Sequence, residues 1–236
     1  LVVLIFYQPF LVLEENLKLK KHHKLVIAAD GSAASGKTTG AKRISKKYGL
    51  KFLSSGLLYR FASYQILKYK PKNKISFLRK SFKKLNLNKL NMINLHSAKI
   101  SEHTSIIAKE KKIRLILKLF QKKFAKRFSK ICIEGRDIGT VILPKADIKF
   151  FFKCDLSTAA KRRFKELKKK NKKIKFQIVK KQLQIRNFRD ISRKNSPLLK
   201  SSDAVIVNTG KLRKIPDMMK KMSEIVEKKI RSKYGS

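Results

Sequence analysis

One loop near the start of the chain, GSAASGKT at residues 31–38, constrains the fold more than any other feature of the sequence. It satisfies the pattern G-x-x-x-x-G-K-S/T in full. An apolar run, KLVIAAD at 24–30, precedes it, and the helix-forming segment KTTGAKRISKKYG at 37–49 follows it. Such loops bind phosphates, because their glycines let the backbone approach an anion and the following helix presents unpaired N–H groups. The loop therefore predicts a nucleoside triphosphate site in an α/β domain.

The residues of this loop have distinct predicted roles. Gly31 and Gly36 permit the turns that aim backbone amides inward. Lys37 is expected to reach the β- and γ-phosphates, and Thr38 to offer its hydroxyl directly to Mg²⁺. We therefore predict that ATP contacts Gly31, Ser32, Ala33, Ala34, Ser35, Gly36, Lys37, Thr38 and Thr39.

Apolar runs that alternate with amphipathic segments predict a parallel sheet with helices on both faces. Residues 72–104 are rich in lysine and show no clear period. The fold class is α/β, with a sheet of about five strands. Strands are predicted at 24–30, 50–55, 130–134, 146–154 and 203–209, and helices at 37–49, 56–69, 105–128, 156–170, 176–195 and 215–234.

The composition sets limits on partners and compartment. The 61 Lys+Arg against 15 Asp+Glu give a formal charge of +46, which favours either a polyanionic partner or a solvated cationic surface. We favour the second interpretation, because the lysines are spread along the whole chain. Cys132 and Cys154 lie in apolar runs and form neither a disulfide framework nor a zinc pattern. They are predicted to be reduced core thiols of a cytoplasmic protein.

The N-terminal segment LVVLIFYQPFLVLEENLKLKK does not match a targeting signal. It has no basic start and no small-residue cleavage site, it is too short to span a bilayer, and Pro9 interrupts it. Residues 1–23 are therefore expected to be a disordered tail or the product of an over-extended reading frame. No association with a membrane is expected.

Two polar loops follow predicted strands, where α/β proteins bind ligands. The first of these loops is EGRDIGTVILPKAD at 134–147. Glu134 is predicted to hold Mg²⁺ through water, and Arg136 to bind a phosphate through two of its nitrogens. Asp137 is predicted to accept a hydrogen bond from a base amine. An ion-paired structural turn is the alternative. In SSGLLYR at 54–60, Ser55 is predicted to cap the next helix, and Arg60 lies one turn into that helix, where it can meet a phosphate.

A third polar stretch, RNFRDISRKNSPL at 186–198, carries charges at helical spacing. Arg186, Asp190 and Arg193 fall on one helix face. Such a face suits a sugar hydroxyl together with a phosphoryl group, and an ordinary solvated face is the alternative.

These stretches together resemble the bacterial cytidylate kinases, which are P-loop nucleoside monophosphate kinases, over residues 24–232. GSAASGKTT, SSGLLYR, EGRDIGTVILPKADIKFFFKC and RNFRDISRKNSPL carry the resemblance. It implies transfer of a phosphoryl group from ATP to CMP or dCMP, with Mg²⁺. The domain would span 24–236, with a monophosphate-binding insert at about 71–130 and a lid at about 161–180.

The resemblance also implies a set of site residues. Ser105 and Arg114 match the base-contacting serine and arginine of the family in relative spacing. The protein is expected to be a monomer that binds no specific nucleic acid. The catalytic residues would be Lys37, Arg136, Arg186 and Arg193, and the CMP site would consist of Ser55, Arg60, Ser105, Arg114, Arg136, Asp137, Arg186, Asp190 and Arg193.

Four positions depart from the family pattern. Ser54 replaces an aspartate, Ser32 a proline, Ala159 an arginine of the lid helix, and Asn187 an aspartate. None of these changes removes a residue that is expected to touch the transferred phosphate.

Two other functions remain compatible with parts of the sequence. The first is a kinase of UMP, AMP or a metabolite alcohol on the same scaffold, against which GRD and the pair Ser105 and Arg114 argue. The second is a basic nucleic-acid-binding protein, but the chain lacks a basic surface interleaved with aromatic residues.

Overall fold

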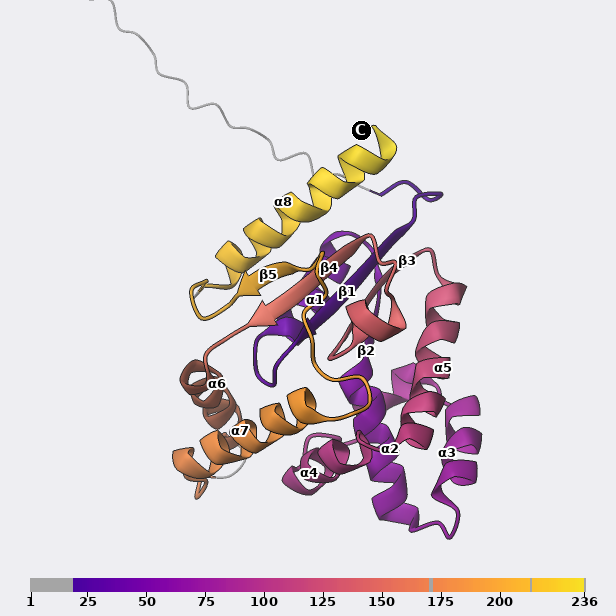
Figure 1. The fold of residues 1–236 in the computed structure, drawn as a ribbon, viewed down its shortest axis with the longest axis vertical. Helices are drawn as coiled ribbons and strands as arrows, with labels where there is room; N and C mark the ends of the chain where they lie inside the picture. The colour runs from indigo at the N-terminus through magenta and orange to yellow at the C-terminus, as the bar shows by residue number, and fades with distance from the viewer. Residues whose placement is uncertain (1–18, 170–171, 213, 236) are drawn as a thin grey trace, which may run out of the picture.

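The computed structural model describes residues 19–169, 172–212 and 214–235 (Figure 1). Five parallel strands form one sheet in the order β2-β3-β1-β4-β5. They are β1 (Leu25–Gly31), β2 (Lys51–Ser54), β3 (Lys130–Gly135), β4 (Ile148–Lys153) and β5 (Val205–Asn208), each within a strand predicted from the sequence or extending it by one residue.

The helices surround this sheet. They are α1 (Lys37–Lys47), α2 (Ser55–Tyr69), α3 (Lys74–Lys83), α4 (Ala98–Ile107), α5 (Lys111–Arg127), α6 (Leu156–Lys168), α7 (Phe176–Ser192) and α8 (Ile215–Tyr234), with the short helical turns η1 (Leu87–Met92) and η2 (Ile138–Ile142). Beyond the carboxyl ends of the strands, α6 and α7 lie on one side and α2 to α5 on the other (Figure 1).

The two faces of the sheet support two separate hydrophobic cores. In the first, which we call the α1–α8 core, Leu25 and Ile27 of β1 pack with Ile44 of α1 and Met222 of α8. In the second, the α2–α5 core, Ala28 of β1 packs with side chains from the helices α2, α3, α4 and α5. Successive residues of one strand serve different cores, because side chains alternate between the faces of a sheet.

The register of the sheet brings polar residues together at its carboxyl edge. Asp30 of β1 pairs with Gly135 of β3, and Ser54 of β2 pairs with Glu134 of β3. Since β1 is central, the loop that follows it lies between the loops that follow β3 and β4.

The long helix predicted at 105–128 is wrong, because the chain turns at 108–110 between α4 and α5. The Arg114 side chain donates to the Ala108 carbonyl oxygen at 3.1 Å, where a continuous helix would place a backbone N–H. Two backbone hydrogen bonds that span three residues tighten the turn: the Lys109 N–H donates to the Ile106 carbonyl oxygen, and the Glu110 N–H donates to the Ile107 carbonyl oxygen. Ser105 and Arg114 therefore belong to different helices.

The cap of α2 is also one residue away from its predicted place. Ser54, and not Ser55, is the N-cap, and its Oγ accepts the Leu57 N–H at 3.2 Å. Ser55 is the first residue of the helix and is buried.

Both cysteines are free thiols, but only one lies in a core. Cys132 is buried in β3, and burial raises the pKa of its thiol to about 12. Cys154 is half-buried, and Arg162 donates to its Sγ at 3.6 Å, so the expectation of a core thiol was wrong at this position.

Most of the predicted N-terminal tail, residues 1–18, lies outside the described residues. Within 19–23, the His23 ring stacks on the Tyr234 ring of α8 with centroids 3.8 Å apart, and Lys130 donates to the Leu19 carbonyl oxygen at 3.1 Å. Across the described ranges, no helix combines the length and the apolar character needed to cross a membrane.

Candidate active site

A cavity of about 910 Å³ opens where β1, β2 and β3 end, and almost all of the predicted site residues line it. Gly31 and Ser32 are the two predicted residues that do not. The cavity joins both halves of the predicted site. The lining residues that the sequence singled out are Ala33, Ala34, Ser35, Gly36, Lys37, Thr38, Thr39, Ser55, Arg60, Ser105, Arg114, Glu134, Arg136, Asp137, Arg186, Asp190 and Arg193.

The loop after β1 needs its glycines for different reasons. Gly31 has φ 154° and is so close to β4 that a Cβ there would lie 2.4 Å from the Phe152 carbonyl oxygen. Gly36, with φ 81°, is the left-handed N-cap of α1. Ala34 also has a positive φ, 56°, which is strained for a residue with a Cβ. The loop is thus held in a curled conformation typical of anion sites.

Contacts from two other segments hold this loop in place. Asn187 of α7 accepts the Ala33 N–H at 3.1 Å, so one of the four family departures supports the loop. Thr209, just after β5, donates through Oγ1 to the Ser35 carbonyl oxygen at 2.9 Å.

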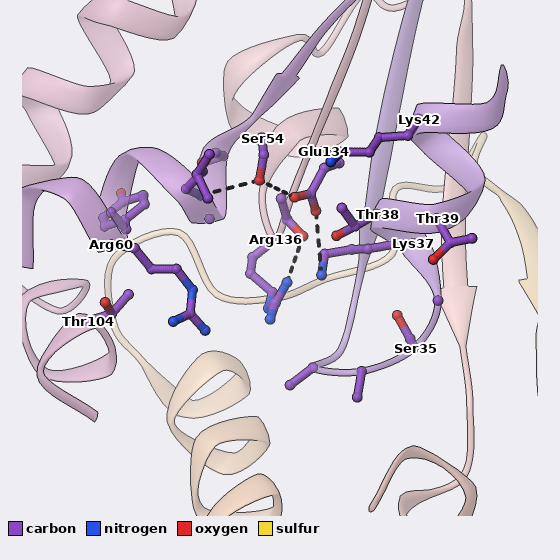
Figure 2. Close-up of a pocket in the computed structure, with 18 of the residues that line it drawn as sticks. Ser35, Lys37, Thr38, Thr39, Lys42, Ser54, Arg60, Thr104, Glu134 and Arg136 are labelled. Atoms are coloured by element: carbon purple, nitrogen blue, oxygen red, sulfur yellow. Dashed lines mark hydrogen bonds and ion pairs between the residues drawn. The ribbon is translucent and has the colours of Figure 1, made fainter. Parts of the chain in front are cut away.

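Lys37 lies in the buried interior of the cavity and faces a carboxylate (Figure 2). Its Nζ is 3.5 Å from Oε2 of Glu134, whose Oε1 accepts a hydrogen bond from the Ser54 hydroxyl. Burial, and then the charge of Arg136, lower the pKa of Lys37 to about 8, and Glu134 opposes both effects. A desolvated ammonium group of this kind gains most from an added anion.

The residues present fit a hydrated magnesium ion. Oε2 of Glu134 is buried and has no hydrogen-bond partner, and Thr38, the second residue of α1, lines the same cavity. Mg²⁺ prefers oxygen ligands and usually keeps waters and substrate phosphates in its shell. In the part of the chain that the structure describes, no cluster of three or more His, Cys, Asp and Glu side chains could hold a metal ion alone.

The Arg114 guanidinium and the Asp137 carboxylate form a buried ion pair. Arg114 comes from α5, whereas Asp137 precedes η2. The guanidinium also lies 5.6 Å from the centre of the Tyr59 ring. The sequence predicted two separate contacts to a base, and the structure shows one joined polar surface.

Arginines of α7, of its C-cap and of the loop after β3 lie around one carboxylate, that of Asp190. Arg136 Nε is 2.7 Å from Asp190 Oδ2, and Arg193 NH1 is 3.6 Å from Asp190 Oδ1. Burial, and then the charge of Arg136, lower the pKa of Arg186 to about 10. The cluster carries more positive than negative charge in a desolvated place, which favours binding of an anion.

Arg60 of α2 and Ser105 of α4 are each held by contacts with another part of the chain. Arg60 donates to the Leu95 carbonyl oxygen at 2.9 Å and to the Ser101 hydroxyl at 2.8 Å, and burial followed by Arg186 lowers its pKa to about 9. Ser105 accepts from Arg189 at 2.8 Å, which joins α4 to α7.

Asp30 is a buried acid beside the site that the sequence did not single out. Its Oδ1 accepts the Ile138 N–H at 2.8 Å and its Oδ2 accepts the Gly139 N–H at 2.7 Å. Burial raises the pKa of Asp30 to about 6, although these two bonds oppose the shift. Asp30 thereby ties the strand before the phosphate loop to the segment that carries Arg136 and Asp137. The sequence signal that could have identified Asp30 is its place directly before Gly31, the first glycine of the loop.

Ser54 and Arg162 are two further polar residues of the cavity without a predicted role at it. Ser54 could have been found from strand pairing, because parallel register sets it beside Glu134. Arg162 of α6 donates to Oγ1 of Thr209 at 2.9 Å and to its carbonyl oxygen at 2.8 Å. Nothing in the sequence distinguished this arginine from its basic neighbours.

Comparison with known proteins gives a consistent result. A family model described as cytidylate kinase matches residues 27–228. A cytidylate kinase of Bartonella tribocorum is 40% identical over 192 residues, which cover 79% of this chain and 87% of that protein. A cytidylate kinase of Clostridium tetani is 31% identical over 223 residues, which cover 90% of this chain and 98% of that protein.

The fold has a counterpart among solved structures. The crystal structure of an uncharacterized protein from Eubacterium ventriosum superimposes with a TM-score of 0.51 at 17% identity, over 89% of this chain and 99% of that chain. At this identity the likeness concerns the fold alone.

Proposed function

The chain belongs to the cytidylate kinase family, and from this premise we propose that its cavity holds ATP beside CMP or dCMP and transfers the γ-phosphoryl group between them. The products are ADP and CDP or dCDP. The observation that carries the proposal is the continuity of the cavity, which runs from Lys37 to the Arg114–Asp137 pair.

The donor end of the cavity supports ATP binding. The curled loop with Gly36 offers backbone amides, and Lys37 supplies a desolvated positive charge. We assign the triphosphate to this loop and the γ-phosphoryl group to the neighbourhood of Lys37.

The acceptor end supports a nucleoside monophosphate. Arg60, Arg136, Arg186 and Arg193 all line this cavity and would hold the monophosphate of the acceptor. Asp190 lies among them and would face the ribose. The base would then reach Arg114, Asp137 and Ser105.

The proposed chemistry depends on alignment and on neutralisation of charge. Lys37 and the arginines would hold donor and acceptor in line while negative charge moves from the γ-phosphoryl group to the leaving ADP. Mg²⁺, held through Thr38 and through water on Glu134, would supply further positive charge at the phosphates. We assign no residue as a general base.

The proposed domain parts correspond to groups of helices. The insert at about 71–130 contains α3, α4 and α5, which pack on α2 in the α2–α5 core. The lid at about 161–180 contains the end of α6 and the start of α7. These two helices pack together in a small apolar cluster that includes Ala160 of α6 and Val179 of α7. We propose that the enzyme is a monomer of the cytoplasm.

A coupled assay of ADP release over a panel of monophosphates tests this function. Wild-type protein is expected to use CMP and dCMP far better than UMP, because cytosine offers an amine to Asp137 and acceptors to Arg114, where uracil presents an oxygen and an N–H. Equal rates with CMP and UMP, or release of ADP that does not depend on the acceptor, would overturn the proposal.

A further inference from the structure

Ser54 lies outside the residues assigned to either nucleotide, yet its hydroxyl joins two parts of the site. Its Oγ accepts the Leu57 N–H of α2 at 3.2 Å and also bonds to Oε1 of Glu134 (Figure 2). A carboxylate accepts hydrogen bonds but donates none. The single hydrogen of the Ser54 hydroxyl is therefore directed at Glu134.

The two oxygens of Glu134 have different surroundings. Oε1 is bound by Ser54, and Oε2 is buried, has no hydrogen-bond partner and faces Lys37 Nζ at 3.5 Å. Without the bond from Ser54, the carboxylate could rotate away from the lysine.

The start of α2 packs tightly against the same end of β3. A Cβ on Gly135 would lie 3.1 Å from the Ser55 Cβ, and a Cβ on Gly56 would lie 4.0 Å from Glu134 Oε1. The chain Leu57–Ser54–Glu134–Lys37 thus runs from the helix that carries Arg60 to the loop that would hold ATP.

We infer that Ser54 is a positioning residue for phosphoryl transfer: it fixes the Glu134 carboxylate toward Lys37 and so couples the acceptor helix α2 to the donor loop. The inference rests on the proposed function of the cavity. Partners that orient a metal-site or catalytic carboxylate commonly change activity 10- to 100-fold when they are removed.

Three variants separate this role from simple helix capping. Ser54→Gly keeps most of the capping preference but removes the hydroxyl, and Ser54→Thr keeps both. Asn73→Gly changes a comparable cap, since Asn73 Oδ1 accepts the Ser76 N–H at 3.0 Å at the start of α3, away from Glu134.

The first measurement is kinetic. We expect Ser54→Gly to lower kcat at least about tenfold with a smaller change in KM for CMP. Ser54→Thr should restore most of the rate, and Asn73→Gly should match the wild type. A similar loss of rate in Asn73→Gly and Ser54→Gly would overturn the inference, because capping alone would then account for it.

The second measurement needs no nucleotide and no metal. The side-chain carbon signals of Lys37 are followed by NMR as a function of pH in the free protein. The charged groups that influence Lys37 most are Arg136, Glu134, Arg186 and Asp190. The two arginines lower its pKa, and the two acids, Glu134 and Asp190, raise it. We expect Ser54→Gly to lower the midpoint for Lys37 relative to the wild type, and Ser54→Thr to leave it in place.

An unchanged Lys37 midpoint together with an unchanged kcat in Ser54→Gly would reject the inference. If the wild type does not phosphorylate CMP, the proposed function fails, but the titration still tests the link between Ser54 and Lys37.

Discussion

Arg114 and Asp137 bind each other at the acceptor end of the cavity, although they come from α5 and from the loop after β3. Each therefore orients the other before any base is present. Arg114 binds Oδ2 of Asp137, so a cytosine amine would be received by Oδ1. A preformed pair of this kind discriminates through the polar groups that a wrong base leaves unpaired.

Asp137→Asn is expected to weaken the preference for CMP over UMP, because an amide can donate to the C4 oxygen of uracil. The ratio of kcat/KM for the two substrates should fall at least about tenfold. Asp203→Asn is the control, since Asp203 pairs with Lys149 and does not line the cavity. An unaltered ratio would place the discrimination elsewhere.

Lys37→Ala is expected to abolish most phosphoryl transfer while the fold remains. Loss of the central cation should reduce kcat/KM by about 10³-fold or more, which corresponds to about 4 kcal/mol. Lys42→Ala, at another lysine of the cavity, is the control. Circular dichroism checks the fold, and near-normal turnover by Lys37→Ala would contradict the assignment.

The wild-type pH profile tests the same lysine. Because the pKa of Lys37 is lowered to about 8, its ammonium form is lost as the pH rises through that value. We expect kcat/KM to decline there, and a flat profile up to pH 10 would contradict the role of Lys37.

The raised pKa of Asp30 predicts a stability effect with a defined sign. Between the unfolded value of 3.8 and the folded value of about 6, the folded protein retains a proton that the unfolded chain has released. The contribution of Asp30 to the free energy of unfolding therefore falls as the pH rises through this window, by about 3 kcal/mol in total.

Urea unfolding of wild type and Asp30→Asn at pH 4 to 7 measures this effect. The asparagine does not titrate, so the stability of the wild type relative to the variant should fall with rising pH. Asp203→Asn is the control, because bonds from Ser201 and Lys149 lower the pKa of Asp203. The stability of the wild type relative to this variant should not fall as the pH rises. Parallel curves for wild type and Asp30→Asn would refute the prediction.

The contact between Arg162 and Thr209 predicts that α6 responds to ligands. Thr209 also contacts Ser35 of the phosphate loop, so a bound triphosphate should stabilise α6 through this chain. Amide hydrogen exchange at 161–169 should slow when a non-hydrolysable ATP analogue and CMP are both bound. The buried face of α8 is the reference, and equal protection of 161–169 with and without ligands would count against closure.

The five strands and their parallel direction could be predicted because their signals are local, each being a short apolar run. The order of the strands, with β1 in the centre, was not predicted. The break between α4 and α5 could not be predicted, because the apolar period continues across Ala108. At the break the Ala108 carbonyl oxygen accepts from the side chain of Arg114, six residues away, and this contact has no local sequence signal.

The residues of the candidate site also divide into those with a local sequence signal and those without one. Motif residues such as Lys37 and Arg136 are recognisable from their neighbours along the chain. Ser54 contacts Glu134, which is distant in sequence, and this contact becomes visible only when the strands are aligned. Asp30 has a local signal in its place before Gly31, but its bond to Gly139 is visible only in the structure. The pairing of Arg114 with Asp137 likewise depends on how α5 packs against η2.

The two cores have a consequence for how such an enzyme can diverge. Changes that reshape the base-reading end are absorbed among α2 to α5, whereas the helix that follows the phosphate loop rests on the opposite side of the same strands. Mutations in one layer thus have little steric access to the other. Repacking on one side of the sheet could therefore alter substrate preference while the packing beneath the phosphate loop stays as it is.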